Sequence, residues 1–171
     1  RLVPGRLGRA GLTMDARAIP FDTRRDCEAR FLAVVAAAQH SLRLFDPDGA
    51  VFALGTIQVD AALRAFLQRG GTLRLGLHEP GHIERHCPRF LRLLRDYGHA
   101  CECRQSPKNL RQLTDSFCIA DDQHVVRRFH SDHMRGEANF DDPRAVDVPH
   151  HRFEAIWEAS RPTLHPTTTG L

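Results

Sequence analysis

The sequence lacks any long apolar segment. No hydrophobic run approaches the roughly 20 residues that an α-helix needs to cross a bilayer. The basic stretch at residues 1–20 also lacks the apolar centre of a secretory signal, so we expect a cytoplasmic protein without membrane contact. Because the sequence begins with Arg1, we expect a piece of a longer polypeptide, a processed product, or an over-extended reading frame that starts naturally at Met14.

Lysine and cysteine are also scarce. Of the 24 basic residues all but Lys108 are arginine, so chemistry that requires a lysine amine has a single candidate. The cysteines number five, an odd count scattered through apparent helices and strands, which favours reduced, buried thiols over a disulfide framework. They are Cys27, Cys87, Cys101, Cys103 and Cys118.

The charge is too small to indicate a nucleic-acid partner by itself. The formal net charge is +3, and the 26% charged and 42% hydrophobic residues are ordinary for a soluble globular protein. Arg85, Arg89, Arg92 and Arg95 fall near one face of a predicted helix at 83–97, but no aromatic residue is interleaved to stack on bases. We therefore interpret this stripe as the solvated side of an amphipathic helix and do not favour nucleic-acid binding.

Histidine is the residue type that suggests a metal. His78, His82, His86 and Cys87 fall within ten residues, and His–x3–His spacing can place two ligands on one helical face. Glycine and proline interrupt this segment, however, and no Cys-x-x-Cys pair accompanies it. We therefore expect surface or loop histidines, with no metal and no cofactor.

Helical and strand patterns alternate along the middle of the chain. Apolar residues recur at helical spacing over 24–39, 56–71, 88–98 and 141–160, and strand patterns occupy 40–46, 72–78 and 99–105. This alternation predicts an α/β domain with a mixed β-sheet flanked by helices. We place the domain at residues 21–160, with flexible tails at 1–20 and 161–171 that are rich in proline, glycine or threonine.

The predicted core combines the inward positions of these elements. They are Phe31, Val34, Leu42, Leu44, Leu63, Phe66, Leu73, Leu75, Leu91, Leu94, Phe117, Ile119 and Trp157. Ligand sites in such sheets lie at the carboxyl ends of strands, where Asp46, His78 and Asp121 occur.

The stretch "TDSFCIADDQHVVRRF" at 114–129 has the pattern of a β-hairpin. Together with the element order and "GEANFDDP" at 136–143, it resembles one half of a phospholipase D-like domain, of an uncharacterised bacterial type. That family carries the motif His-x-Lys, four residues, then Asp, followed further along by Gly-Ser-x-Asn. Residues two apart on a strand point to the same face, so the family's His and Lys converge on one phosphate. The His attacks phosphorus as a nucleophile, and the Lys stabilises the phosphoryl charge.

Laid on this sequence, the motif is degenerate. The resemblance places Thr114 at the His position, Ser116 at the Lys position and Asp121 at the Asp position. Gly136, Ala138 and Asn139 match the later element, where Glu137 replaces its Ser, and about eight extra residues separate the two parts. A hydroxyl without an activating base cannot replace an imidazole nucleophile, and neither Thr nor Ser supplies a positive charge.

Two interpretations of the remaining polar residues stay open. Thr114, Ser116, Asp121 and Asn139 line a small phosphate or ligand pocket, or they cap and close the hairpin, which is the commoner role for polar residues near a turn.

Three functions follow from the resemblance. The leading one is a non-catalytic binding or interaction module whose ligand the sequence does not identify, a phosphate-containing ligand being one that the resemblance suggests. We predict a homodimer because half-domains of this family pair so that two motifs meet, and because a hairpin with a free strand edge needs cover. The alternative is a phosphodiesterase or nuclease whose nucleophile has moved to His130 or His133 in the insertion. The third is an arginine-dependent nucleic-acid binder without catalysis.

Overall fold

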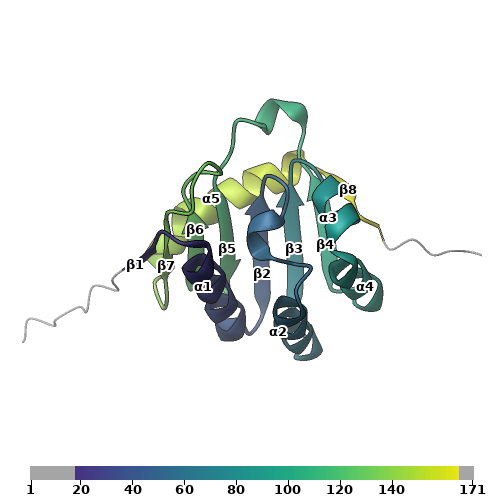
Figure 1. Cartoon of the computed structure of the whole chain (residues 1–171), viewed down its shortest axis with the longest axis horizontal. Helices are drawn as coiled ribbons and strands as arrows, with labels where there is room; N and C mark the ends of the chain where they lie inside the picture. The colour runs from purple at the N-terminus through teal and green to yellow at the C-terminus, as the bar shows by residue number, and fades with distance from the viewer. Residues whose placement is uncertain (1–17, 166–171) are drawn as a thin grey trace, which may run out of the picture.

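The computed structural model describes residues 18–165, which are built around one eight-stranded mixed sheet (Figure 1). The strands lie in the order β1-β7-β6-β5-β2-β3-β4-β8. Their bounds are β1 (Ile19–Phe21), β2 (Ser41–Asp46), β3 (Thr72–Leu77), β4 (Cys101–Gln105), β5 (Ser116–Ala120), β6 (His124–Arg128), β7 (Gly136–Asn139) and β8 (Arg161–Thr163). The predicted α/β class with a mixed sheet flanked by helices is confirmed.

Helices connect the parallel part of the sheet. The α-helices are α1 (Arg24–Ala37), α2 (Ile57–Gln68), α3 (Gly81–His86), α4 (Pro88–Asp96) and α5 (Pro143–Ala159), and the 3₁₀ turns are η1 (Ala50–Phe52) and η2 (Lys108–Leu110). Strands β2, β3 and β4 run parallel because α2 and then α3 and α4 return the chain to the starting end of the sheet. Strands β5, β6 and β7 add to β2 in antiparallel fashion through the hairpin.

The helix starts follow ordinary capping chemistry. The Thr23 hydroxyl accepts a hydrogen bond from the Asp26 backbone at the start of α1, and Thr56 caps α2 in the same way. Helix α5 begins with Asp142 as its cap and Pro143 in its first turn, where proline loses no hydrogen bond. The predicted helix boundaries at these three caps are therefore set by local sequence.

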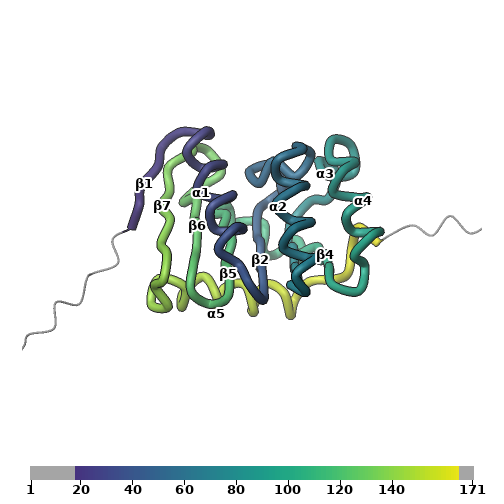
Figure 2. Tube along the Cα trace, turned by 90° about the horizontal axis from the view of Figure 1, so that it is seen from below, coloured from purple at the N-terminus to yellow at the C-terminus, as the bar shows by residue number. Residues whose placement is uncertain are grey.

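Helices cover both faces of the sheet. Helices α1, α2, α3 and α4 lie on one face, and α5 crosses the strands on the other (Figures 1 and 2). The larger apolar cluster packs beneath α1, α2 and α4, and a second cluster that includes Phe45, Phe117, Phe153 and Trp157 packs beneath α5. Every residue predicted for the core is buried except Leu91, which is half-buried at the outer side of α4.

The sheet has two short edge strands that the sequence pattern does not predict. Strand β1 pairs with β7 and strand β8 pairs with β4, so ordered pairing extends into both segments predicted as flexible tails. Pro20 and Pro162 sit in the middle of these edge strands, where proline removes a hydrogen-bond donor that another chain would need for pairing. Residues 1–17 and 166–171 lie outside the described residues.

The hairpin lies inside the sheet. Strand β5 pairs with β2, and β6 is covered by β7, so neither hairpin strand presents a free edge. A free edge was one reason to predict a homodimer, and that reason does not apply. No helix in the part of the chain that the structure describes is long and apolar enough to cross a membrane.

Candidate functional site

A buried ionic cluster occupies the carboxyl end of β2. Asp46 ends β2, Ser116 begins β5 and Arg128 ends β6, and the hairpin register pairs Ser116 directly with Arg128. The Arg128 Nη2 atom donates to Asp46 Oδ1 at 3.0 Å and to Ser116 Oγ at 3.1 Å, and the Ser116 hydroxyl donates to the same Asp46 oxygen. The other carboxylate oxygen of Asp46 accepts from the backbone N–H of Gly49 at 2.7 Å.

This cluster closes the position that the resemblance assigns to the motif lysine. Asp46 is completely buried and Ser116 is 2% exposed, so neither offers an atom to a ligand. Burial raises the pKa of the Asp46 carboxyl above its usual value, against the opposing effects of the Ser116 hydrogen bond and the Arg128 charge. The arrangement is therefore an ion pair inside the α1 side of the domain and not a binding pocket.

His78 follows β3 at the same end of the sheet. Its Nε2 atom donates to the Leu113 carbonyl at 2.7 Å, and its Nδ1 atom bonds to the Ser106 hydroxyl. Phe45 packs edge-on against the imidazole, with ring centroids 5.3 Å apart. Because both ring nitrogens are occupied, His78 fastens the segment between β4 and β5 to the sheet and is not placed to act on a substrate. Across residues 18–165, no three His, Cys, Asp or Glu side chains form a group that could hold a metal ion.

The four residues predicted to share a polar pocket lie at opposite ends of the sheet. Ser116 pairs with Arg128, and Arg128 pairs with Gly136, so Thr114 and Ser116 lie at the end where β7 begins. Asn139 pairs with Val125 near the turn of the hairpin, at the far end. The prediction of one pocket formed by all four therefore fails, because β7 runs antiparallel to β6 and carries Asn139 away from Thr114.

Asp121 has a structural position at that far end. Its carboxylate accepts hydrogen bonds from the backbone N–H groups of Gln39 at 2.7 Å, His40 at 2.7 Å and Ser41 at 2.9 Å. Burial alone would raise the pKa of Asp121, but these three donors hold the pKa below its ordinary value. Asp121 thus ties the start of β2 to the hairpin turn, which matches the interpretation of a hairpin-closing residue.

His130 and His133 lie in the loop between β6 and β7. Each accepts a hydrogen bond at Nδ1 from a backbone N–H two residues along, at 3.0 and 3.1 Å, and their ring centroids are 6.0 Å apart. Asp121 and Asn139, which would have to assist either as a nucleophile, lie at the other end of the sheet. The geometry therefore does not assemble the catalytic group that a relocated nucleophile would need.

Thr114 lines a pocket on the α5 side of the sheet. This pocket, of about 270 Å³, is called the Thr114 pocket and is lined by Gln112, Leu113, Thr114, Asp115, Arg127, Phe129 and Arg152. Its walls come from the segment before β5, which projects beyond the end of the sheet in Figure 1, from the end of β6 and from α5. Of the residues predicted to bind a ligand, only Thr114 reaches it. Arg127 and Asp115 were missed, although the alternation of the hairpin places both on the α5 face.

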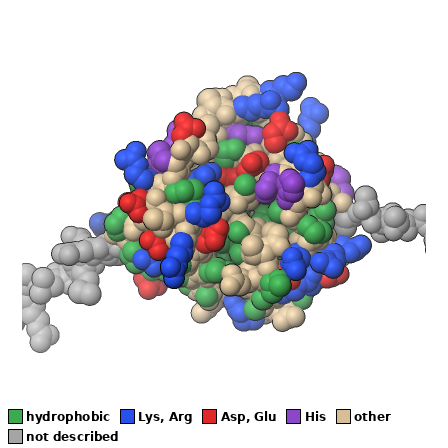
Figure 3. All heavy atoms as spheres, viewed as in Figure 1, with side chains coloured by type: hydrophobic (Ala, Val, Ile, Leu, Met, Phe, Trp, Pro, Cys, Tyr) green, Lys and Arg blue, Asp and Glu red, His purple; other side chains and the backbone are tan. Residues whose placement is uncertain are grey.

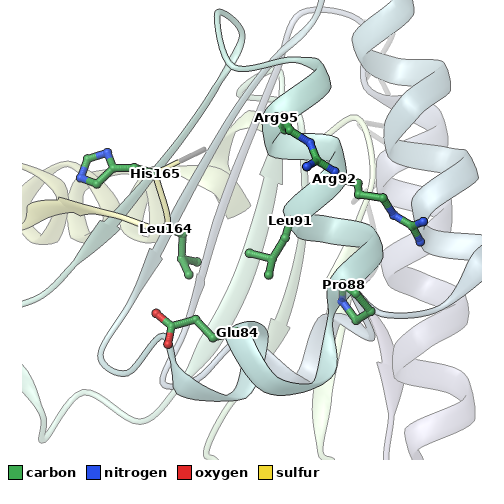
Figure 4. A pocket seen from close by; sticks show the side chains of 7 residues that line it. All are labelled: Glu84, Pro88, Leu91, Arg92, Arg95, Leu164 and His165. Atoms are coloured by element: carbon green, nitrogen blue, oxygen red, sulfur yellow. The ribbon is translucent and has the colours of Figure 1, made fainter. Parts of the chain in front are cut away.

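A larger cavity of about 720 Å³ lies far from these residues, beside α4 and the C-terminal end of the described chain. Figure 4 shows Leu91 and Leu164 lining it from opposite sides, with Glu84 near its base. Its walls are mostly apolar and bring together no nucleophile with a base. On the face of the molecule in Figure 3, basic and acidic side chains are interspersed, and no continuous surface of one sign is visible.

Comparison with known proteins identifies the fold. Residues 23–165 match the model of a family described as a domain of unknown function, DUF7931. No curated protein matches the chain.

Solved structures of the phospholipase D family are similar to this chain. Nuc from Salmonella typhimurium, a phospholipase D family member, is 14% identical, with a TM-score of 0.62, and the match covers 86% of this chain and 96% of that chain. NucT from Helicobacter pylori is 13% identical, with a TM-score of 0.61, and the match covers 86% and 99% of the two chains. TrmBL2, an archaeal chromatin protein that binds DNA, is 17% identical with a TM-score of 0.66, and the match covers 88% of this chain and 56% of that one. At these identities the likeness shows the phospholipase D-like fold alone.

Proposed function

Since this chain belongs to the family described as a domain of unknown function, DUF7931, and has the phospholipase D-like fold, we propose that it is a non-catalytic binding module. The fold is retained in this module while the chemistry of the motif is lost. Its ligand contains phosphate, which is the group that the fold's motif addresses in the family.

The burial of Ser116 in the Asp46–Arg128 ion pair is the observation that supports this proposal best. A lysine at this position would have to reach a phosphate, but Ser116 is buried and bonded to Asp46 and Arg128. The cation nearest to it, Arg128, is paired with the Asp46 carboxylate. Thr114 has no hydrogen bond from its hydroxyl to a histidine or carboxylate among residues 18–165, so nothing activates it as a nucleophile.

Turnover of a simple phosphodiester tests the proposal. We expect no hydrolysis of bis(p-nitrophenyl) phosphate and no cleavage of DNA above a blank purified in parallel from cells without the gene. The same assay is run on His130→Ala and His133→Ala, with His151→Ala, an exposed histidine of α5, as the matched control. Activity in the wild type that disappears in His130→Ala or His133→Ala and survives in His151→Ala would establish the relocated-nucleophile enzyme instead.

Nucleic-acid binding without catalysis is the second candidate. The similarity to TrmBL2, a DNA-binding chromatin protein, favours it, and the interspersed charges of the face in Figure 3 weigh against it. Retention on a DNA column that falls steeply with salt would support this candidate, because neutralised phosphates release counterions.

We also propose a homodimer in a cytoplasmic setting. Pairing of half-domains supports the dimer, and the unpaired state of all five cysteines supports a reducing compartment. The proline-bearing edges β1 and β8 are poor surfaces for strand pairing, so we do not propose a dimer formed by pairing of these edges. Light scattering that gives 19.3 kDa at every concentration would exclude the dimer.

A further inference from the structure

We infer that the Thr114 pocket binds a phosphate monoester and selects it over both sulfate and phosphodiesters. The inference rests on the proposed function, since it assigns a ligand class and a site to the binding module. The site lies on the α5 face, whereas Ser116, at the position of the motif lysine, points to the α1 face. The pocket therefore includes Thr114, at the position of the motif histidine, but not Ser116, at the position of the motif lysine.

Arg127 is the cation of this pocket. It pairs across the hairpin with Phe117, whose ring belongs to the cluster beneath α5, so the Arg127 side chain leaves the sheet on the same face. No carboxylate or carbonyl in residues 18–165 accepts a hydrogen bond from its guanidinium, and its Nε atom is buried without a partner. Its nearest aromatic contact is the ring of Phe129, at 5.9 Å. The guanidinium of Arg127 therefore has no partner among the described residues and is available to an anion in the pocket.

Asp115 needs a hydrogen-bond donor, whereas Arg127 needs an acceptor. The side chain is 8% exposed, and one of its oxygens accepts from Arg152 Nη2 at 2.7 Å. Its other oxygen, Oδ2, is buried and has no donor. Asp115 thus has an oxygen without a hydrogen-bond donor, Arg127 has a guanidinium without an acceptor, and both residues line the same pocket. With Arg152 included, two arginines face one aspartate, so the pocket carries a net charge of about +1 and attracts an anion in spite of Asp115.

Only some anions satisfy both groups. A ligand must carry an anionic oxygen for Arg127 and an O–H group for Asp115 within one compact group. Phosphate and phosphate monoesters keep a P–OH group in their monoanionic form, since their second pKa is about 6. Sulfate is fully deprotonated at neutral pH, and a phosphodiester has no P–OH group. Either would place oxygens against Asp115 Oδ2 without a proton between them, which is repulsive.

The remaining walls suit the same ligand. The Thr114 hydroxyl and the Gln112 amide add neutral donors, and Phe129, at 45% exposure, offers an apolar surface to the group that carries the phosphate. The volume of about 270 Å³ is slightly below the range of roughly 300 to 1,000 Å³ for drug-sized ligands. A phosphate with a small ester group is therefore the size of ligand that the pocket takes.

Calorimetric titration of the full chain tests the inference. The four probes are inorganic phosphate, phenyl phosphate as the monoester, sulfate and dimethyl phosphate as the diester, all at about pH 6, where monoesters retain a P–OH group. We expect the first two to bind and the last two to bind at least about tenfold more weakly, which is the factor for one lost hydrogen bond to a charged group. Phenyl phosphate and inorganic phosphate separate an esterified ligand from the free ion, because only the ester reaches Phe129.

Two variants and a control test which residues are responsible for anion binding and selectivity. Arg127→Gln is expected to lower phosphate affinity by about tenfold or more, and Arg92→Gln, an exposed arginine of α4, is expected to leave it unchanged. Asp115→Asn supplies amide donors in place of the carboxylate, so sulfate should bind this variant as well as phosphate does. Thermal unfolding checks that each variant is folded, and the selectivity of the wild type needs no variant at all.

The outcomes separate this inference from the proposed function. Equal affinity of the wild type for sulfate and phosphate, no binding of phosphate, or full affinity in folded Arg127→Gln would each overturn the inference. Hydrolysis of a phosphodiester would instead overturn the non-catalytic function while leaving the selectivity of the pocket measurable.

Discussion

Replacing Arg128 with methionine should expose the cost of burying Asp46 without a cation. Methionine keeps the apolar stem of the side chain and removes the guanidinium that donates to Asp46 at 3.0 Å. Breaking a buried ion pair by removing one partner costs about 3 to 5 kcal/mol. Because Asp46 keeps the donors Gly49 and Ser116, we expect the lower end, about 3 kcal/mol of the free energy of unfolding.

The measurement is urea unfolding followed by the fluorescence of Trp157, the only tryptophan, which stacks on Phe153 beneath α5. A loss of about 3 kcal/mol corresponds to a fall in Tm of about 6 to 12 °C for a domain of this size. Arg92→Met, which removes an exposed arginine of α4, should stay within about 0.5 kcal/mol of the wild type.

The loss of stability caused by Arg128→Met should become smaller as the pH falls. The pKa of Asp46 in the folded protein lies above its ordinary value of 3.8 because of burial. A raised carboxyl pKa means that the folded state binds the proton more tightly, so the group lowers stability as pH rises above that ordinary value. Removing Arg128 raises the folded pKa further. The difference between wild type and Arg128→Met should therefore be largest near neutral pH and shrink as the pH falls, because protonation of Asp46 removes the buried charge that Arg128 balances.

A double-mutant cycle with Asp46→Asn decides whether the charge pair is the cause. In the Asp46→Asn background, removal of Arg128 leaves no buried charge, so its cost should be smaller by at least about 1 kcal/mol. The reasoning is refuted if the two changes add within about 0.5 kcal/mol, or if the cost of Arg128→Met is the same at acidic and neutral pH.

Three further predictions concern other parts of the domain. Asp121→Asn should lower the free energy of unfolding by about 1 to 2 kcal/mol above pH 4. The difference in stability between wild type and variant should shrink in acid, because the pKa of Asp121 is depressed in the folded protein and its contribution disappears as the pH falls through that pKa. A difference that grows in acid would contradict this. A thiol reagent at about pH 8 should label the native protein at Cys101 alone, since the other four thiols are buried. The labelling should be slow, because burial raises the pKa of Cys101 to about 12, and Cys101→Ser should abolish it. Native Trp157 should emit at shorter wavelength than free tryptophan, because it is 5% exposed; an emission maximum equal to that of the free amino acid would mean that α5 is not docked.

The long elements could be predicted from the sequence because several apolar residues recur at the spacing of each element. Helices α1 and α2 and strands β2 and β3 follow apolar spacing, and their caps at Thr23 and Thr56 are local. Strands β1, β7 and β8 could not be predicted in this way, since they span three or four residues and carry proline or glycine. The pairings of β1 with β7 and of β8 with β4 join segments far apart in the sequence, so only the tertiary fold defines these two edge strands.

Only part of the Thr114 pocket could be predicted, because it too depends on how distant segments are placed by the fold. The sequence placed Thr114 and Ser116 in the hairpin segment, but it also grouped them with Asn139 from the motif order. The insertion before Gly136 forms the loop between β6 and β7, so the chain turns back before the Gly-x-x-Asn element and carries Asn139 to the opposite end. Motif spacing carries positional information only where the intervening chain has the family's length.

Arg127 and Arg128 are adjacent residues of β6 with different partners. Successive residues of a strand point to opposite faces, so Arg128 enters the α1 side and Arg127 enters the α5 side. Arg128 binds a buried carboxylate and Ser116, the residue at the position that the resemblance assigns to the motif lysine. Arg127 meets no acceptor and opens into the Thr114 pocket beside Asp115. The two arginines are thus each other's control: neutralising Arg128 should change stability, and neutralising Arg127 should change anion binding.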